Sequence, residues 1–255
     1  MSHPPAFRPP VWALRVAGGL ALAALWETAA WFSHSLLLPR VTDTAAALFG
    51  LVRDREIWHA LRASNEGLVL GFAAALLAGV PLGLALGRWP RLAAWVGPYL
   101  HLLLALPTTA LIPLIFIVAG LGLASRALVV CLFSLPVVAE CARDGAGRAD
   151  PRLIEMAAAF GATPWQAWRT VVLPASVPGV MTGARLGLAR AVDGMVVVEL
   201  LLVAVGVGRL LLDFQGRFEA AQVYAVVVVV MIEAVLLAHA ARLIERRLAR
   251  ARERA

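Results

Sequence analysis

Long apolar segments alternate with short polar ones along this 255-residue chain. Six of the apolar runs are long enough to cross a bilayer, because about 30 Å of hydrocarbon needs roughly 20 helical residues. The predicted spans are residues 11–32, 66–87, 92–120, 124–140, 177–207 and 220–241. The pattern therefore predicts an all-α, polytopic membrane protein with about six transmembrane helices.

Prolines and glycines divide the middle of this pattern. Residues 92–139 carry one formal charge, Arg126, and the preceding glycines at 120 and 122 predict that the chain reverses there, so we expect two helices. The prolines in these helices should bend or interrupt them, and the freed carbonyls are tolerated only where they face protein or water. Pro107 and Pro113 are therefore candidates for the lining of a solute pathway, and Pro98 and Pro136 are further expected bends.

Arginines set the expected orientation. All 23 basic residues are arginine, and an inside N-terminus places 16 of them inside and seven outside. By the positive-inside rule, both termini should be cytoplasmic. The first run also has a feature of a secretory signal peptide, since Arg15 precedes an apolar stretch with small residues at 21 and 23. Its removal would leave five crossings.

Composition excludes several classes of protein. Apolar residues make up 61% of the chain, charged residues 15%, and mean hydropathy is +0.82, which a soluble enzyme of this length does not need. The net charge of +7 comes from loops and tail, so nucleic acid is not required to explain it. We expect residues 1–59 to form a span and an outer polar segment, 60–250 a transport domain, and 251–255 a basic tail. Residues 33–64 should form a lip over the outer mouth.

Small residues recur at every fourth position on two predicted helices. One row is Gly79, Gly83 and Gly87, and the other is Gly179, Gly183, Gly187 and Ala191. Helices in lipid pack by close backbone approach, so both rows predict tight helix contacts within or between subunits.

Four acids fall inside the apolar runs: Glu27, Asp193, Glu199 and Glu233. Charge at bilayer depth is costly and marks candidate functional positions. Asp193 follows Arg190 by three residues, so an internal ion pair is the simpler interpretation there. Glu199 has no base nearby in sequence. We take Asp193 and Glu199 as pathway candidates, and expect Glu233 to meet an interhelical partner or to be protonated.

No catalytic or metal-binding arrangement stands out. The chain has no lysine, which excludes a Walker-type phosphate loop, and its two cysteines lie ten residues apart, about 15 Å along a helix. No ligand spacing for a metal and no cofactor motif is present. If ATP drives this protein, another polypeptide must bind and hydrolyse it.

Residues 150–174 form a polar, capped island between apolar runs. Asp150 and Pro151 begin a predicted helix with Met156, Ala157 and Phe160 on one face, and Gly161 ends it. Thr163 then starts a second helix as a capping box, with Trp165 on one side, and Pro174 should stop it. Such a pair suits a groove on a cytoplasmic partner. The alternative is an amphipathic pair on lipid headgroups.

This island resembles the cytoplasmic signature of permease subunits of bacterial ATP-binding-cassette (ABC) importers. Glu155, Ala157, Gly161, Leu173 and Pro174 match the pattern, while Met156 replaces an alanine and Val171 an isoleucine. Over about residues 60–250 the chain is similar to the nitrate, sulfonate and taurine branch, through elements such as Ser64, Glu199 and the glycines at 206 and 208. Asn65, Glu66 and Asp193 depart from the branch pattern, so local pairing should differ.

The resemblance implies two permease copies, an ABC ATPase and a periplasmic solute-binding protein in a bacterial inner membrane. Residues 155–168 would transmit ATPase closure to the membrane helices, and a small solute such as a sulfonate, taurine or nitrate would cross by alternating access. An ion-driven secondary transporter remains the alternative, favoured by the intramembrane acids and disfavoured by the capped island and the absence of a detectable repeat.

Overall fold

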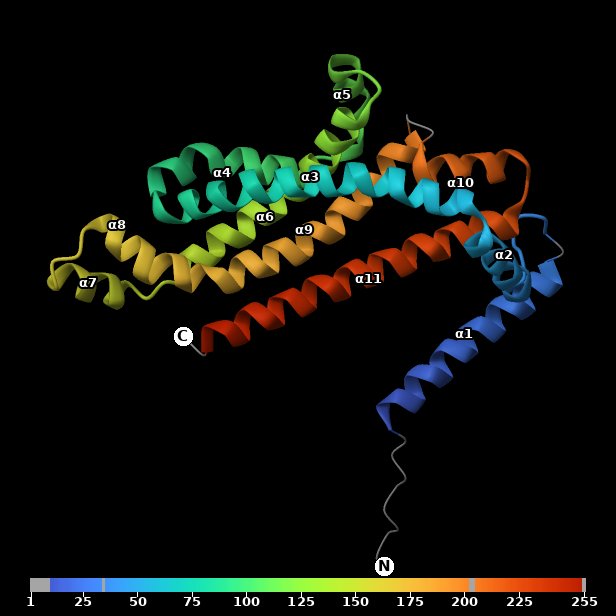
Figure 1. The fold of residues 1–255 in the computed structure, drawn as a ribbon, viewed down its shortest axis with the longest axis horizontal. Helices are drawn as coiled ribbons and strands as arrows, with labels where there is room; N and C mark the ends of the chain where they lie inside the picture. The colour runs from blue at the N-terminus through green and yellow to red at the C-terminus, as the bar shows by residue number, and fades with distance from the viewer. Residues whose placement is uncertain (1–9, 34, 202–204, 254–255) are drawn as a thin grey trace, which may run out of the picture.

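Helices are the regular elements of the computed structural model, which describes residues 10–33, 35–201 and 205–253 (Figure 1). Their bounds are α1 (Val11–Ser33), α2 (Val41–Arg53), α3 (Arg55–Arg88), α4 (Pro90–Ala105), the 3₁₀ turn η1 (Thr108–Leu111), α5 (Ile112–Ala119), α6 (Leu123–Gly147), α7 (Pro151–Ala159), α8 (Pro164–Ala167), the π-helical segment η2 (Trp168–Val172), α9 (Leu173–Leu201), α10 (Gly206–Gly216) and α11 (Ala220–Glu253). The all-α prediction is confirmed.

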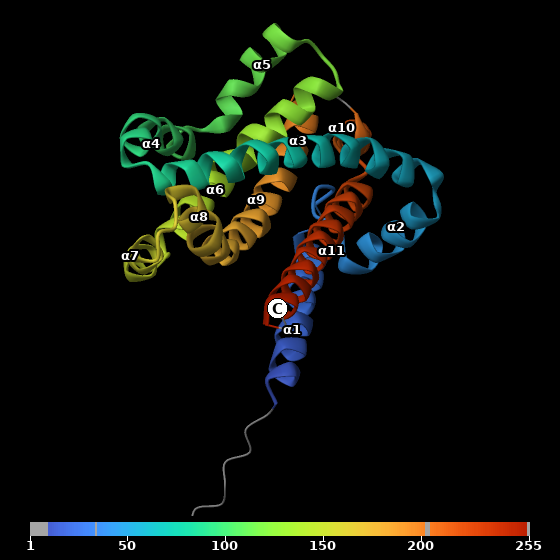
Figure 2. The ribbon, with the colours of Figure 1, turned by 60° about the vertical axis from the view of Figure 1, so that its left-hand side comes forward.

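Five helical runs in the described residues are long and apolar enough to cross a membrane: α1, α3, α6, α8 through α9, and α11. The third predicted span, residues 92–120, is not one straight helix, because α4 and the η1–α5 segment meet at an angle of 96°. The break lies at Leu106, whose extended conformation (φ −70°, ψ 141°) is the one that a following proline favours. Helix α5 projects away from the other helices (Figure 1, Figure 2).

Of the four prolines, Pro107 marks a break between helices. Pro107 lies at the break, whereas Pro113 belongs to the first turn of α5, where its missing N–H leaves no helical hydrogen bond unmade. Pro98 and Pro136 lie inside α4 and α6, which continue through them.

The central helix of the bundle is α6, whose main contacts are with α3 and α9. A methyl group at Gly83 of α3 would overlap the carbonyl of Ala139 on α6, and one at Gly179 of α9 would approach the Cα of Gly145 to 2.5 Å. Both rows of small residues therefore face α6 and let the backbones approach closely. This confirms the predicted tight packing within the subunit.

Helix α3 begins earlier than its hydrophobic pattern predicts, at Arg55 and not at residue 66. Asp54 caps it by accepting a hydrogen bond from Glu56 N, 3.0 Å away. Its polar first turns pack through Ile57 into a core with Leu51 of α2 and Val226 of α11. The polar segment 33–64 is thus mostly helical and partly packed into the bundle.

Helix α1 makes few contacts and leaves most of its side chains exposed. Its acid, Glu27, accepts hydrogen bonds from Val41 N (2.7 Å) and from the Thr42 hydroxyl (3.0 Å). Glu27 therefore caps the N-terminus of α2, whose first N–H groups have no partners inside their helix. This capping of α2 therefore explains why an acid lies within the apolar run of α1.

Two other predicted ends differ from the structure. The fourth span was expected to end at residue 140, but α6 continues to Gly147 because its last turns remain packed against α3 and α9. The fifth was expected to reach residue 207, but α9 ends at Leu201 and α10 begins at Gly206, whose φ of +65° marks the turn. Residues 202–204 lie outside the described residues.

Candidate coupling site

The first short helix of the predicted island, α7, is capped as the sequence suggests. The Asp150 side chain accepts a hydrogen bond from Arg152 N at 2.9 Å, and Pro151 occupies the first turn. None of the α7 residues is buried. Met156 is 52% exposed and Phe160 at its end is 86% exposed, so the predicted apolar face has no cover within the described chain.

The turn after α7 depends on a glycine. Gly161 has φ of +80°, a left-handed conformation that side chains with a Cβ rarely adopt. Its N–H donates to Ala158 O at 2.9 Å, and Ala162 N–H donates to Ala157 O at 3.0 Å. These two bonds form the Schellman motif that ends the helix and satisfies its last carbonyls. The predicted glycine elbow is confirmed.

The second short helix, α8, begins with the predicted capping box. The Thr163 hydroxyl accepts from Gln166 N at 3.3 Å, and the Gln166 side chain accepts from Thr163 N at 2.7 Å. The sequence pattern was therefore sufficient to locate this helix start to the residue.

The predicted stop at Pro174 is wrong. The chain stays helical through the π-helical segment η2 and enters α9 at Leu173, with Pro174 as its second residue. A proline in an α-helix lacks an N–H and clashes with the carbonyl four residues earlier, and a wider π turn just before it relieves that register. As a result, α8, η2 and α9 form one helical run from Pro164 to Leu201.

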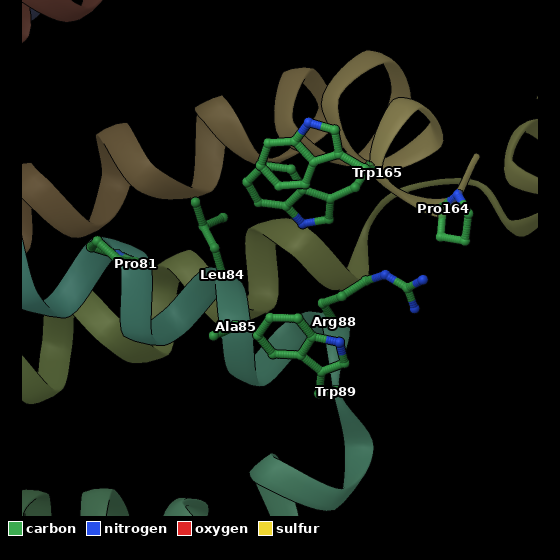
Figure 3. Close-up of a pocket in the computed structure, with 8 residues that line it drawn as sticks. Pro81, Leu84, Ala85, Arg88, Trp89, Pro164 and Trp165 are labelled. Carbon is green, nitrogen blue, oxygen red and sulfur yellow. The ribbon is translucent and has the colours of Figure 1, made fainter. Parts of the chain in front are cut away.

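An apolar cavity of about 460 Å³ separates α8 from the end of α3 (Figure 3). Figure 3 shows Trp165 and Trp89 on opposite sides of it, with Arg88 reaching toward Pro164. Trp165 stacks on Trp168 with ring centroids 5.0 Å apart. Space and not close packing therefore separates α8 from α3 at this point.

The remaining predicted coupling residues lie along the same loop. Glu155 is exposed on α7, and Ala157 is partly buried. Leu173 packs at the edge of a core formed by Leu84 of α3 and Val172. In Figure 1 and Figure 2, α7 and α8 lie beside the turn between α3 and α4, at one end of the molecule. The structure thus places these residues in the α7–α8 segment and the first turn of α9, at that end.

The pathway candidate Glu199 lies in a closed polar cluster, only 1% exposed. Its Oε2 accepts hydrogen bonds from the Ser64 hydroxyl (2.8 Å) and from Gly208 N (3.1 Å). Arg126 Nη1 lies 3.9 Å from its Oε1 and also donates to Ala63 O at 3.0 Å. The base that the local sequence lacked is therefore supplied by α6, and the cluster joins α3, α6, α9 and α10.

The other candidates lie elsewhere. Asp193 forms the expected ion pair with Arg190, at 3.7 Å, and both side chains are mostly exposed on α9. Pro107 and Pro113 are exposed beside the break between α4 and α5. The structure does not bring Pro107, Pro113, Asp193 and Glu199 together into one site, and their part in a pathway remains a prediction.

Sequence analysis missed two polar contacts between helices. Asn65 of α3 donates a hydrogen bond to the Glu233 carboxylate of α11. Glu233 thus has the interhelical partner that was expected, although the sequence did not identify which residue it would be. His101 of α4 lies 3.4 Å from Glu140 of α6. Polar residues at 140, 143 and 144 follow helical spacing, and this is the signal from which a polar face on α6 could have been predicted.

The fold and the loop define a class of protein: a multi-pass helical membrane component with a capped helix pair exposed at one end. The chain belongs to the family of binding-protein-dependent transport system inner membrane components, whose family model matches residues 67–252. It is therefore a permease subunit of an ABC importer.

Two relatives and one solved structure illustrate this membership. The taurine transport system permease protein TauC of Escherichia coli (strain K12) is 33% identical over 196 residues, which are 76% of this chain and 71% of TauC. The putative aliphatic sulfonates transport permease protein SsuC of Bacillus subtilis (strain 168) is 27% identical over 229 residues, 89% and 83% of the two chains. An inward-facing structure of the MetNI methionine ABC transporter shares the fold, with a TM-score of 0.63, 23% identity, and coverage of 74% and 96%.

Proposed function

We propose that two copies of this chain form the membrane pathway of an ABC importer for small organosulfonates, such as taurine, in a bacterial inner membrane. The solute class rests on the similarity to TauC and SsuC, which are named for taurine and aliphatic sulfonates. Nitrate and other small oxyanions are the nearest alternatives in charge and size. A periplasmic solute-binding protein delivers the solute to the outer face.

The observation that carries the partner assignment is the exposed apolar face of α7. Leu153, Met156 and Phe160 are 45%, 52% and 86% exposed. An amphipathic helix with such a face is suited to a hydrophobic groove on another protein. The ATPase provides that groove and binds and hydrolyses ATP, so this chain is non-catalytic and carries no cofactor of its own.

Arginine placement supports the orientation. Cytoplasmic termini put the α7–α8 loop on the side of the ATPase, together with Arg148, Arg152 and Arg169. Exposed apolar side chains elsewhere on the helices, such as Leu22 and Val118, suit contact with lipid tails or with the second copy. The outer face then lies at the opposite ends of the helices, near Glu199.

Transport assays with the full assembly test this proposal. The permease, its ATPase and its binding protein are reconstituted into proteoliposomes with ATP inside, and uptake of labelled taurine is measured. We expect uptake that requires ATP, the ATPase and the binding protein. Uptake that persists without the ATPase and stops when the proton gradient is dissipated would instead establish an ion-driven transporter.

Docking is tested separately by copurification. Glu155→Arg inverts the charge of an exposed α7 side chain and should release the ATPase while the permease still inserts in the membrane. Glu56→Arg, an equally exposed change in the first turn of α3, is the matched control and should retain it. ATPase recovered at wild-type yield with Glu155→Arg would contradict the docking assignment.

A further inference from the structure

Helix α6 carries a polar stripe on the side away from its packed face. Glu140, Arg143, Asp144 and Gly147 follow one another at i, i+3, i+4 and i+7, so they share one face of the helix. The fully buried Val138, Ala139 and Ala142 lie on the face that α3 and α9 cover. The polar stripe is therefore directed out of the bundle.

Three side chains of this region form a charged cluster between α4 and α6. Arg143 Nη1 donates to Glu140 Oε1 at 3.2 Å and lies 3.5 Å from Oε2, while His101 Nε2 lies 3.4 Å from the same Oε1. The side chains of His101, Glu140 and Arg143 are 59%, 25% and 30% exposed. In the described part of the chain, these bonds use only Nη1 of the guanidinium, so its other N–H groups remain available to a ligand.

The cluster lies within the spanning helices, with Arg143 nearest to the coupling-loop end, about 6 Å before the end of α6 at Gly147. At 1.5 Å per residue, Glu140 is about 10 Å before the end of α6 at Gly147, and His101 is about 16 Å from the start of α4 at Pro90. Ionisable groups at such depth face protein or water, because exposure to lipid tails is costly. The open side of this cluster must therefore meet an aqueous space or another polar surface.

A cavity adjoins the cluster at Arg143, on the side of the coupling-loop end. It measures about 730 Å³ and is lined by Arg143, Asp144 and Arg148 of the α6 end and by residues of α3 and α4. Arg143 belongs both to this cavity and to the cluster. Farther along the bundle, α9 exposes the Arg190–Asp193 pair. The next residue, Gly194, packs on Phe133 of α6, which precedes Glu140 by seven residues. Charged groups thus occur at two depths of the span.

We propose that His101, Glu140 and Arg143 form a solute-contact site in the translocation pathway, which takes the sulfonate group on Arg143 and His101 and the amine of an aminosulfonate on Glu140. This inference rests on the proposed import of organosulfonates. A guanidinium presents paired N–H donors that match the oxygens of an oxyanion, and Glu140 both orients Arg143 and offers a carboxylate to an ammonium group. The cluster is partly exposed, so solute can reach it and leave it on the side of the cavity.

The test compares two solutes that differ only in the amine. Proteoliposomes with the complete transporter take up labelled taurine or labelled ethanesulfonate, and wild-type uptake of either solute establishes the import function independently of the cluster. We expect Arg143→Gln to reduce uptake of both at least tenfold, with partial recovery in Arg143→Lys. Glu140→Gln should reduce taurine uptake several-fold more than ethanesulfonate uptake.

Arg185→Gln is the matched control. It removes the arginine of another interhelical ion pair, Arg185–Glu245 at 3.7 Å between α9 and α11, and should change neither solute preference nor ATPase copurification. An equal effect of Glu140→Gln on both solutes, or normal uptake by Arg143→Gln, would refute the solute-contact site while leaving the import function in place.

A second measurement separates a water-filled pathway from a contact between two permease copies. In a chain whose Cys131 and Cys141 are replaced by alanine, His101→Cys should react with a membrane-impermeant thiol reagent in the complete transporter, and taurine should slow that reaction. Absence of labelling together with oxidative cross-linking of His101→Cys between copies would overturn the proposal and assign the cluster to the subunit interface.

Discussion

The Ser64 hydroxyl on α3 donates a 2.8 Å hydrogen bond to the Glu199 carboxylate on α9, across 135 positions of sequence. The Ser64 hydroxyl oxygen also accepts a hydrogen bond from the Val207 N–H, at 3.0 Å, at the start of α10. One small side chain thus pairs with one oxygen of a buried acid and with an N–H in the first turn of another helix. These hydrogen bonds join α3, α9 and α10 at a buried point, where a polar group without a protein partner could not bond to water instead.

Ser64→Ala should destabilise the permease, because it leaves both the Glu199 oxygen and the Val207 N–H without this partner. Each buried group left unsatisfied costs about 1–3 kcal/mol. The free energy of unfolding, measured by detergent titration of the purified protein, should fall by that order. Ser134→Ala is the control: Ser134 is equally buried, but its hydroxyl donates within its own helix, to Val130 O at 2.9 Å and Cys131 O at 3.4 Å. Equal losses from both changes would contradict the bridging function of Ser64.

Gly83→Ala should weaken the contact between α3 and α6, because the added methyl group overlaps the Ala139 carbonyl. Overpacking of this kind costs about 1–3 kcal/mol. Gly19→Ala on α1 is the matched change, since no atom lies within 4 Å of the Cβ position there. We expect a lower midpoint of thermal unfolding and a lower yield of monodisperse protein for Gly83→Ala alone. An unchanged midpoint would show that the two helices separate easily.

Gly161→Pro should release the ATPase, because proline excludes the φ of +80° that directs the chain from α7 into α8. Gly161→Asn keeps access to the left-handed region and should retain most of the binding. Copurification of the ATPase with each variant measures the difference, and membrane insertion of both variants is checked by fractionation. If Gly161→Pro binds as well as Gly161→Asn, the angle between α7 and α8 is unimportant for docking.

Asn65 and Glu233 should be energetically coupled. Asn65 also donates to Leu61 O at 2.8 Å, which fixes its amide toward α11, and Glu233 Oε2 is buried without a hydrogen bond. A double-mutant cycle with Asn65→Leu and Glu233→Leu should give an interaction energy of about 0.5–3 kcal/mol. Glu66→Gln, which removes one member of the exposed Arg62–Glu66 pair at 3.6 Å, should change stability by less than about 1 kcal/mol. Additive effects of the two leucine substitutions would mean that the contact is incidental.

Features governed by local sequence were predicted best. Asp150, Gly161 and the Thr163–Gln166 box satisfy backbone groups within a few residues, so their patterns alone identify the helix ends. The glycine rows were also informative, because small residues at every fourth position lie on one face of a helix, whichever helix packs against that face. For these elements, the physical rule acts over one or two turns of helix.

Features that depend on distant residues were not predictable in this way. The partner of Glu199 is on α3, and the early start of α3 depends on packing of Ile57 against α2 and α11. The predicted helix end at Pro174 was wrong because a π-helical turn accommodates this proline, whereas a proline usually ends a helix. In each case the deciding contact or backbone register is set by neighbours that the local pattern does not specify.

The uninterrupted helix from Pro164 to Leu201 has a mechanical consequence. At 1.5 Å per residue its α9 part alone is about 44 Å long, and it joins the loop proposed to face the ATPase to the Glu199 cluster. A few degrees of tilt at the loop would sweep the far end sideways by several ångströms. Tilting of the helix as a rigid body would then transmit the nucleotide-driven movement from one surface of the membrane to the other, without a series of side-chain rearrangements.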